Sequence, residues 1–167
     1  MMVVVSDVSW TERVGDLPDR GAVRVRHAPA SAGEPTFLLL HGWTATADIN
    51  WGSSYRALLL RGGIVSLDHR GHGRGLRGVR FSLEGCADDA ADVVRALGID
   101  RVIVVGYSMG GAIAQLVARR HPDLTAGVVL AATAGTFNDH PRERRVFRAL
   151  AGLTTVARAL PVELRTA

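Results

Sequence analysis

The chain has 167 residues, of which 47% are hydrophobic and 22% are charged, so it can bury one globular core and is not a disordered chain. With a single cysteine, it is not a disulfide scaffold either. Its 20 basic residues are all arginine, and 16 acidic residues reduce the formal net charge to +4, which gives no support for nucleic-acid binding.

Short apolar segments recur along the chain and predict the strands of a sheet. Residues 23–27 alternate apolar and polar side chains, as in a half-exposed strand near a sheet edge. Four nearly continuous apolar runs are typical of strands covered on both faces, and they lie at 37–41, 64–68, 102–106 and 127–131. Strands of this kind predict a parallel sheet.

Helical patterns lie between these strands. Residues 55–60 have helical spacing, and Ser82 is the expected N-cap of a helix whose apolar residues continue to Leu97. A third helix, 109–121, begins with small residues that allow it to lie close to a sheet. The alternation predicts the α/β class, with a doubly wound, mostly parallel sheet.

Two groups of charged residues are expected to be solvated helix faces. Asp88, Asp89 and Asp92 fall mostly off the apolar stripe of the second helix, which favours a solvated face over a metal site. Several arginines at 142–148 begin a later helical stripe. A solvated face is favoured there too, with a site for anionic substrates as the alternative.

The sequence Gly-Tyr-Ser-Met-Gly at 106–110 fits the pattern G-x-S-x-G. The pattern follows an apolar run and opens the third helix, a setting in which a sharp turn presents a serine hydroxyl above a sheet. Larger side chains at Gly106 and Gly110 would collide with the neighbouring strand and helix. We therefore expect Ser108 to be a nucleophile, the alternative being an ordinary turn serine.

Two more motifs complete a recognisable order. The strand at 37–41 ends in His-Gly-Trp, and the strand at 64–68 runs into Asp-His-Arg-Gly-His-Gly. With these three motifs, residues 36–136 resemble the α/β-hydrolase fold superfamily. The resemblance implies a sheet of the α/β-hydrolase type, a serine hydrolase of the esterase-like kind, and neither a metal nor an organic cofactor.

The resemblance also implies roles for individual residues. Ser108 is expected to attack the substrate, while the backbone N–H groups of Trp43 and Met109 form an oxyanion hole. The remaining motif residues are expected to be structural, and they are His41, Gly42, Asp68, Arg70, His72, Gly106 and Gly110. Trp43 and Met109 could also be simple pocket wall or core.

The family's acid and histidine have no clear counterparts in the chain. Both follow later strands in the family, whereas the histidines after Ser108 are His121 and His140, and neither resembles the family's histidine. We therefore expect 1–136 to be the N-terminal part of a hydrolase core, lacking the last two strands, and 137–167 to begin a helical cap. The strand at 127–131 then becomes an apolar sheet edge that favours self-association.

The leading functional expectation is a serine hydrolase that cleaves ester-like bonds of small molecules by acyl transfer. A carbon–carbon bond hydrolase, a peptidase and a cofactor-free perhydrolase stay open. Ser108 argues against the branches that use an aspartate at this position, namely haloalkane dehalogenases and epoxide hydrolases. A non-catalytic fragment or binding module is the alternative from another class.

Location and partners follow from simple features. The single Cys86 cannot form an internal disulfide, and the N-terminus has no positively charged lead to an export signal, so we predict a cytoplasmic protein. The uncharged stretch 102–118 contains glycines and is interpreted as strand, turn and helix, not as a membrane span. The expected partner is a small-molecule substrate.

Overall fold

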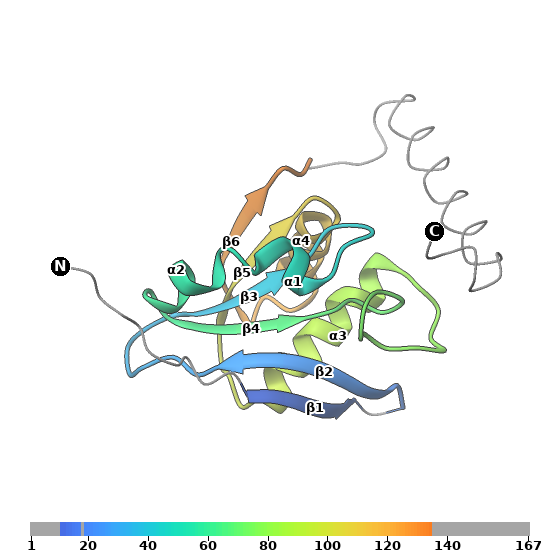
Figure 1. The fold of residues 1–167 in the computed structure, drawn as a ribbon, viewed down its shortest axis with the longest axis horizontal. Coiled ribbons are helices and arrows are strands. Elements are labelled where there is room, and N and C mark those ends of the chain that lie inside the picture. Colours follow the sequence, from blue (N-terminus) through green and yellow to red (C-terminus); the bar gives the residue numbers. More distant parts are fainter. Residues whose placement is uncertain (1–10, 18, 135–167) are drawn as a thin grey trace. The chain divides into compact units, whose positions relative to one another are not determined.

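The computed structural model describes residues 11–17 and 19–134. The chain divides into two units, Met1–Thr133 and Ala134–Ala167, and the fold described below is that of the first. The predicted cap segment, 137–167, lies outside the described residues. The elements, labelled in Figure 1, are β1 (Thr11–Leu17), β2 (Gly21–Ala28), β3 (Thr36–Leu40), α1 (Ala47–Trp51), α2 (Tyr55–Leu59), β4 (Gly63–Leu67), α3 (Leu83–Ala96), β5 (Val102–Tyr107), α4 (Met109–Arg120) and β6 (Thr125–Ala131).

The strands form one six-stranded sheet in the order β1-β2-β4-β3-β5-β6. Strand β3 lies in the middle of the parallel part, where Phe37 pairs with both Ile64 of β4 and Ile103 of β5. Strand β6 extends this part in parallel to β5, whereas β1 and β2 form an antiparallel hairpin beside β4. The mostly parallel sheet is confirmed, but β1 was not predicted from the sequence.

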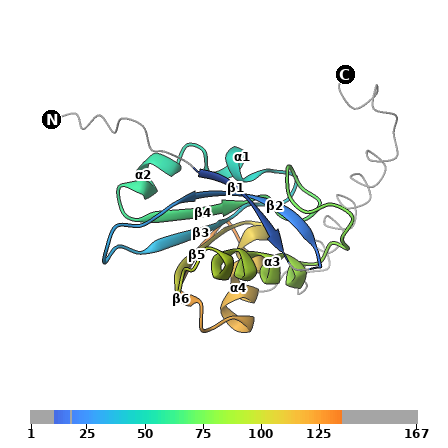
Figure 2. The same ribbon diagram turned by 90° about the horizontal axis from the view of Figure 1, so that it is seen from below.

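Helices cover both faces of the sheet, as expected of a doubly wound fold (Figure 2). On one face, α3 and α4 contribute Val94 and Ile113 to a large apolar core. On the other face, Trp51 of α1 and Tyr55 of α2 pack in a smaller cluster with Ile64 of β4. Every residue of β4 is buried, which explains its nearly continuous apolar sequence.

The predicted helix boundaries follow local chemistry. The Ser82 hydroxyl accepts a hydrogen bond from the Gly85 N–H at 3.0 Å, so the expected N-cap of α3 is confirmed. Helix α4 ends at Arg120, with Pro122 just beyond, since proline cannot continue the backbone hydrogen bonding. Within the described ranges, no helix has the length and apolarity needed to cross a lipid bilayer.

Strand β6 is confirmed, but its expected coverage on both faces is not found within the described residues. The exposed fractions of Val128, Val129 and Leu130 are 38%, 48% and 47%. The strand pairs with β5 on one side and stands last in the sheet order. Unpaired apolar edges are templates for further pairing, so self-association through β6 stays a prediction that size-exclusion chromatography can test.

The expectation that α3 carries a solvated acidic face is wrong for Asp89. This residue is 2% exposed, and its carboxylate accepts two hydrogen bonds from Arg70, both of 2.7 Å, and one of 2.6 Å from Arg20. Asp92 pairs with Arg20, and Asp88 pairs with Arg120 at 2.8 Å. The helical pattern gave no sign of these partners because they come from other parts of the chain.

Candidate active site

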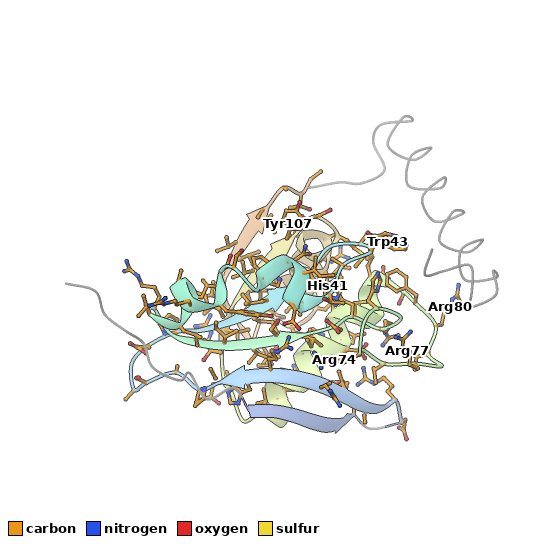
Figure 3. The ribbon with its side chains drawn as sticks, viewed as in Figure 1. His41, Trp43, Arg74, Arg77, Arg80 and Tyr107 are labelled. Atoms are coloured by element: carbon orange, nitrogen blue, oxygen red, sulfur yellow. The ribbon has the colours of Figure 1, made fainter. Side chains whose placement is uncertain are left out.

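The three sequence motifs meet at one edge of the sheet. Strands β3, β4 and β5 are parallel neighbours, so their carboxyl ends lie at the same edge, and each motif lies at one of these ends. Ligand sites of open α/β sheets lie at this edge. Figure 3 labels His41, Trp43 and Tyr107 in this region.

Ser108 occupies the sharp turn between β5 and α4 in a rarely populated backbone conformation. Its φ is +53° and its ψ is −117°, a combination that a residue with a side chain adopts only when the surroundings enforce it. The turn is held by a 2.9 Å hydrogen bond from the Ser108 N–H to the Ala131 carbonyl. Although Ser108 is at the N-cap position, its half-buried side chain makes no capping hydrogen bond.

Glycines allow the backbone to close around this turn. A Cβ at Gly106 would lie 2.2 Å from the Gly110 carbonyl oxygen, and a Cβ at Gly110 would lie 2.1 Å from the Leu40 carbonyl oxygen. A Cβ at Gly42 would lie 3.3 Å from the Cβ of Ser108. The backbone of the His-Gly-Trp segment therefore lies directly beside the serine.

His41 holds the ends of two strands together. Its Nδ1 donates to the Gly42 carbonyl at 2.8 Å, and its Nε2 accepts from the His69 backbone N–H at 2.9 Å. Burial lowers the pKa of His41, so the ring is neutral and this tautomer satisfies both nitrogens. An imidazole with both nitrogens engaged cannot take a proton from Ser108.

Asn50 is a site residue that the sequence reasoning missed. Its Oδ1 accepts a 2.7 Å hydrogen bond from the Gly42 N–H, which fixes the segment beside Ser108. Asn50 belongs to α1, a short helix that was not predicted. Thr46, whose hydroxyl accepts from the Ile49 N–H at 3.3 Å, is an N-cap signal that could have revealed this helix.

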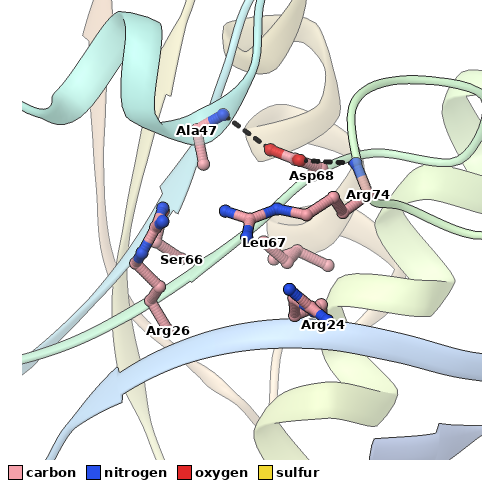
Figure 4. Close-up of a pocket in the computed structure, with 7 residues that line it drawn as sticks. All are labelled: Arg24, Arg26, Ala47, Ser66, Leu67, Asp68 and Arg74. Atoms are coloured by element: carbon pink, nitrogen blue, oxygen red, sulfur yellow. Dashed lines mark hydrogen bonds between the residues drawn. The ribbon is translucent and has the colours of Figure 1, made fainter. Parts of the chain in front are cut away.

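The Asp-His-Arg-Gly-His-Gly segment makes contacts in several directions. The Asp68 carboxylate accepts from the N–H groups of Ala47 and Arg74, both at 2.8 Å, and so joins the end of β4 to the start of α1 (Figure 4). Arg70 reaches α3 through its pair with Asp89. His72 lies edge-on to the indole of Trp43, with ring centroids 5.7 Å apart.

Backbone strain collects around the same edge. Besides Ser108, positive φ values of 58° and 47° occur at Thr44, which follows β3, and at Ala132, which follows β6. For a β-branched residue such as Thr44, this conformation is a true outlier. Strained residues cluster at functional sites because the surrounding structure must hold them in place.

The structure does not bring a histidine base to Ser108 within the described residues. His121 caps the far end of the 12-residue helix α4, about 18 Å along the helix axis, and its Nε2 lies 2.9 Å from Asp88. His140 falls outside the described residues. Within residues 11–17 and 19–134, no three His, Cys, Asp or Glu side chains gather in a way that could hold a metal ion.

His69 makes the fold sensitive to acid. Burial lowers its pKa well below the usual value, and the nearby His41 and His72 act in the same direction. Unfolded histidine binds a proton near pH 6.5, but folded His69 does not, so its contribution is complete above that pH and is lost as the pH falls. We expect the free energy of unfolding to fall with pH at a limiting slope of about 1.4 kcal/mol per pH unit. Urea unfolding from about pH 7.5 to about pH 5 measures this slope.

Two variants test the origin of this acid sensitivity. The His69→Phe chain places an apolar ring of similar size in the core. Its free energy of unfolding should lose most of this dependence on pH. The His121→Gln chain, altered at the end of α4, should keep it. An unchanged slope in the His69→Phe chain would show that another group causes the acid loss.

Comparison with known proteins places the chain in a family. The profile of the alpha/beta hydrolase fold matches residues 35–154. The "Putative carbamate hydrolase RutD" of Caulobacter vibrioides is 35% identical over 123 residues, which is 72% of this chain and 45% of the relative. The "Non-heme haloperoxidase" of Rhodococcus erythropolis is 40% identical over 93 residues, 54% of this chain and 34% of the relative.

Solved structures agree with the sequence relatives. A marine microorganism esterase superposes with a TM-score of 0.67 at 27% identity, over 79% of this chain and 50% of the esterase. The chain spans less than half the length of the two curated relatives named above. On the family match and the shared sheet topology, the chain belongs to the alpha/beta hydrolase fold family.

Proposed function

We propose that Ser108 is the nucleophile of a hydrolase that cleaves ester-like bonds of small molecules by acyl transfer. The observation that carries this proposal is the conformation of Ser108, with φ at +53° and a hydroxyl that does not cap its helix. A hydroxyl that makes no capping hydrogen bond is available to a substrate. The relatives named esterase and carbamate hydrolase support this proposal, since both names describe the cleavage of an ester or a carbamate.

The surroundings of Ser108 also support the proposed oxyanion hole. The N–H of Met109 belongs to the first turn of α4, where backbone donors and the helix dipole favour negative charge. The second donor is the N–H of Trp43, the residue after Gly42. Gly42 lies against Ser108 and is held by its hydrogen bond to Asn50. Two fixed donors would stabilise the tetrahedral intermediate, and losing one such donor typically slows a reaction about 10²–10³-fold.

The proposal also requires a proton acceptor for Ser108, and residues other than those described would have to supply it. A serine hydroxyl is a weak nucleophile without a base, so the non-catalytic fragment is the competing reading. The discriminating experiment must therefore not depend on a catalytic histidine. Replacing the hydroxyl by a thiol meets this condition, because a thiolate is intrinsically nucleophilic.

In the S108C chain, alkylation reports on position 108 because the natural cysteine is not expected to react. The natural thiol, Cys86, is fully buried, and burial raises its pKa to about 12. A thiol at 108 would be half-exposed at a helix N-terminus, which lowers a thiol pKa. We expect iodoacetamide to alkylate position 108 at least about a hundredfold faster than Cys86. Mass spectrometry of peptides measures the two alkylation rates.

The control places the same thiol at an exposed serine outside the turn, in the S53C chain. If residue 108 reacts no faster than this control in native protein, the site has no special activation and the proposal fails.

A serine-directed fluorophosphonate probe then tests whether the 167-residue chain holds a base for Ser108. Labelling that is lost in the Ser108→Ala chain would defeat the non-catalytic reading.

A second candidate reaction is favoured by one relative. The relative from Rhodococcus erythropolis is named a non-heme haloperoxidase, and the perhydrolase expected from the sequence carries out a peroxide-using reaction that this name favours. In that reaction the acyl group on Ser108 would pass to hydrogen peroxide in place of water, giving a peracid. The two reactions differ in the acyl acceptor and share the same nucleophile.

A further inference from the structure

The two peptide groups on either side of Gly42 are each held by one side chain. The first joins His41 to Gly42, and its N–H donates to the Asn50 Oδ1 at 2.7 Å. The second joins Gly42 to Trp43, and its carbonyl oxygen accepts from the His41 Nδ1 at 2.8 Å. The N–H of this second peptide is the Trp43 donor of the proposed oxyanion hole. Because peptide groups are planar, holding two in succession leaves that N–H little freedom to turn.

Asn50 belongs to a helix that is fastened at both ends. The first residue of α1, Ala47, is buried, and its N–H donates to the Asp68 carboxylate at 2.8 Å. The last residue, Trp51, is buried in the smaller apolar cluster. Asn50 directly precedes Trp51, so its backbone is held by the packing of that indole. The side chain of Asn50 therefore holds Gly42 at one place relative to the sheet.

Asn50 and Ser108 approach Gly42 on the same side. A Cβ on Gly42 would lie 3.4 Å from the Asn50 Oδ1, 3.3 Å from the Ser108 Cβ and 3.2 Å from the Tyr107 Cδ1. Within residues 11–17 and 19–134, the bond from Gly42 is the one hydrogen bond that the Asn50 side chain makes. Asn50 thus serves a single contact, and that contact lies beside Ser108.

We propose that Asn50 is a positioning residue for acyl transfer at residue 108. It holds Gly42 where the Trp43 N–H is directed at the oxyanion of the tetrahedral intermediate. The inference rests on the proposed function, because it requires residue 108 to attack an acyl carbon. Without the Asn50 oxygen, the N–H of the buried Gly42 has no acceptor, and the segment must shift to find one. A displaced Trp43 N–H stabilises the oxyanion less, since such donors act only at the correct position.

Two reactions of the S108C chain separate the oxyanion hole from the nucleophile. With p-nitrophenyl acetate, the thiolate at position 108 attacks the carbonyl carbon, an oxyanion forms, and p-nitrophenolate leaves to give a thioester. With iodoacetamide, the same thiolate displaces iodide from a saturated carbon, and no oxyanion forms. The acylation ratio, defined as the rate of acylation divided by the rate of alkylation, therefore reports on the oxyanion hole. Changes in the amount of thiolate or in its exposure affect both rates and cancel.

The background of the acylation reaction is low and can be measured. The chain contains no lysine, so no lysine amine competes for the ester, and Cys86 is fully buried. The Ser108→Ala chain gives the remaining release of p-nitrophenolate, which is subtracted. Mass spectrometry of peptides checks that the acetyl group is on residue 108.

In the S108C chain, Asn50→Ala should lower the acylation ratio at least about tenfold, since complete loss of one oxyanion donor costs about 10²–10³-fold. Asn50→Asp keeps an acceptor of the same shape for the Gly42 N–H, although its charge opposes the oxyanion. Its ratio should therefore lie between those of Asn50→Ala and of S108C alone. The matched control is Ile49→Ala, which changes the preceding residue of α1. The Ile49 side chain is 73% exposed, and this variant should keep the ratio of S108C.

The two reactions also distinguish failure of this inference from failure of the proposed function. If residue 108 is neither alkylated faster than the S53C control nor acylated, the proposed function fails and the inference fails with it. If S108C is acylated but Asn50→Ala keeps its ratio, Asn50 does not position the donor. Equal falls in both rates would indicate general damage to the site and would also overturn the inference, as would an Asn50→Asp ratio no higher than that of Asn50→Ala. Urea unfolding of each chain fixes conditions in which all of them are folded.

Discussion

A Gly110→Ala chain is expected to lose about 3 kcal/mol of unfolding free energy, although alanine is the better helix former by about 1 kcal/mol. The added Cβ would lie 2.1 Å from the Leu40 carbonyl oxygen and 2.8 Å from that of His41. Both atoms are backbone, so α4 would have to move away from β3. Thermal unfolding should show a fall of about 6–12 °C in the midpoint.

Gly127→Ala is the matched control for this steric explanation. A Cβ at Gly127 meets nothing within 4 Å. We expect a change within about 0.5 kcal/mol, as for other substitutions that touch no special feature. Equal losses at the two positions would mean that general glycine effects, and not the approach of α4 to Leu40, cause the destabilisation.

The same substitution connects the fold to the site. Gly110 allows the start of α4 to lie against the end of β3, which places Ser108 beside Gly42. An S108C chain that also carries Gly110→Ala should therefore be alkylated more slowly than S108C alone under conditions where both are folded. Unchanged alkylation would indicate that the turn keeps its geometry without this contact.

The sequence predicted those parts of the fold whose signals are local. The apolar runs located β3, β4, β5 and β6, and Ser82 located the start of α3, because strand burial and helix capping depend on adjacent residues. Strand β1 has a mixed sequence and is defined by pairing with β2, so it was missed. Long-range pairing is not visible in a short window of sequence.

The sequence predicted the motifs of the candidate site, but not the residues that hold its backbone in place. The G-x-S-x-G spacing pointed to Ser108, since glycines are needed where the backbones approach. Nothing local indicated that Asn50 would hold Gly42 or that Thr44 would adopt a positive φ. These features exist only because distant segments meet, and the arginine partners of the buried Asp89 were hidden for the same reason.

Replacing Asp89 by alanine is expected to cost about 3–5 kcal/mol, because it leaves a charged partner buried without its counterion. The Arg70 side chain is 10% exposed and is bound by Asp89 through both of its carboxylate oxygens. An arginine side chain stays charged in proteins even without an acidic partner, so the guanidinium of Arg70 in this variant cannot escape by losing its proton. Equilibrium unfolding in urea measures this loss, which is a large part of the stability of an ordinary domain.

Two further chains separate an unpaired buried charge from a lost surface ion pair. Asp123 also pairs with an arginine, Arg95, at 3.0 Å, but its side chain is 64% exposed, so Asp123→Ala should leave stability nearly unchanged. The double chain Arg70→Met with Asp89→Leu removes both charges and fills the space with apolar groups. We expect it to be more stable than Asp89→Ala alone, because Arg70 no longer leaves an unpaired charge and Arg20, the other partner of Asp89, keeps its pair with Asp92. A double chain no more stable than the single one would show that hydrogen bonding and fit, and not the buried charge, account for the loss.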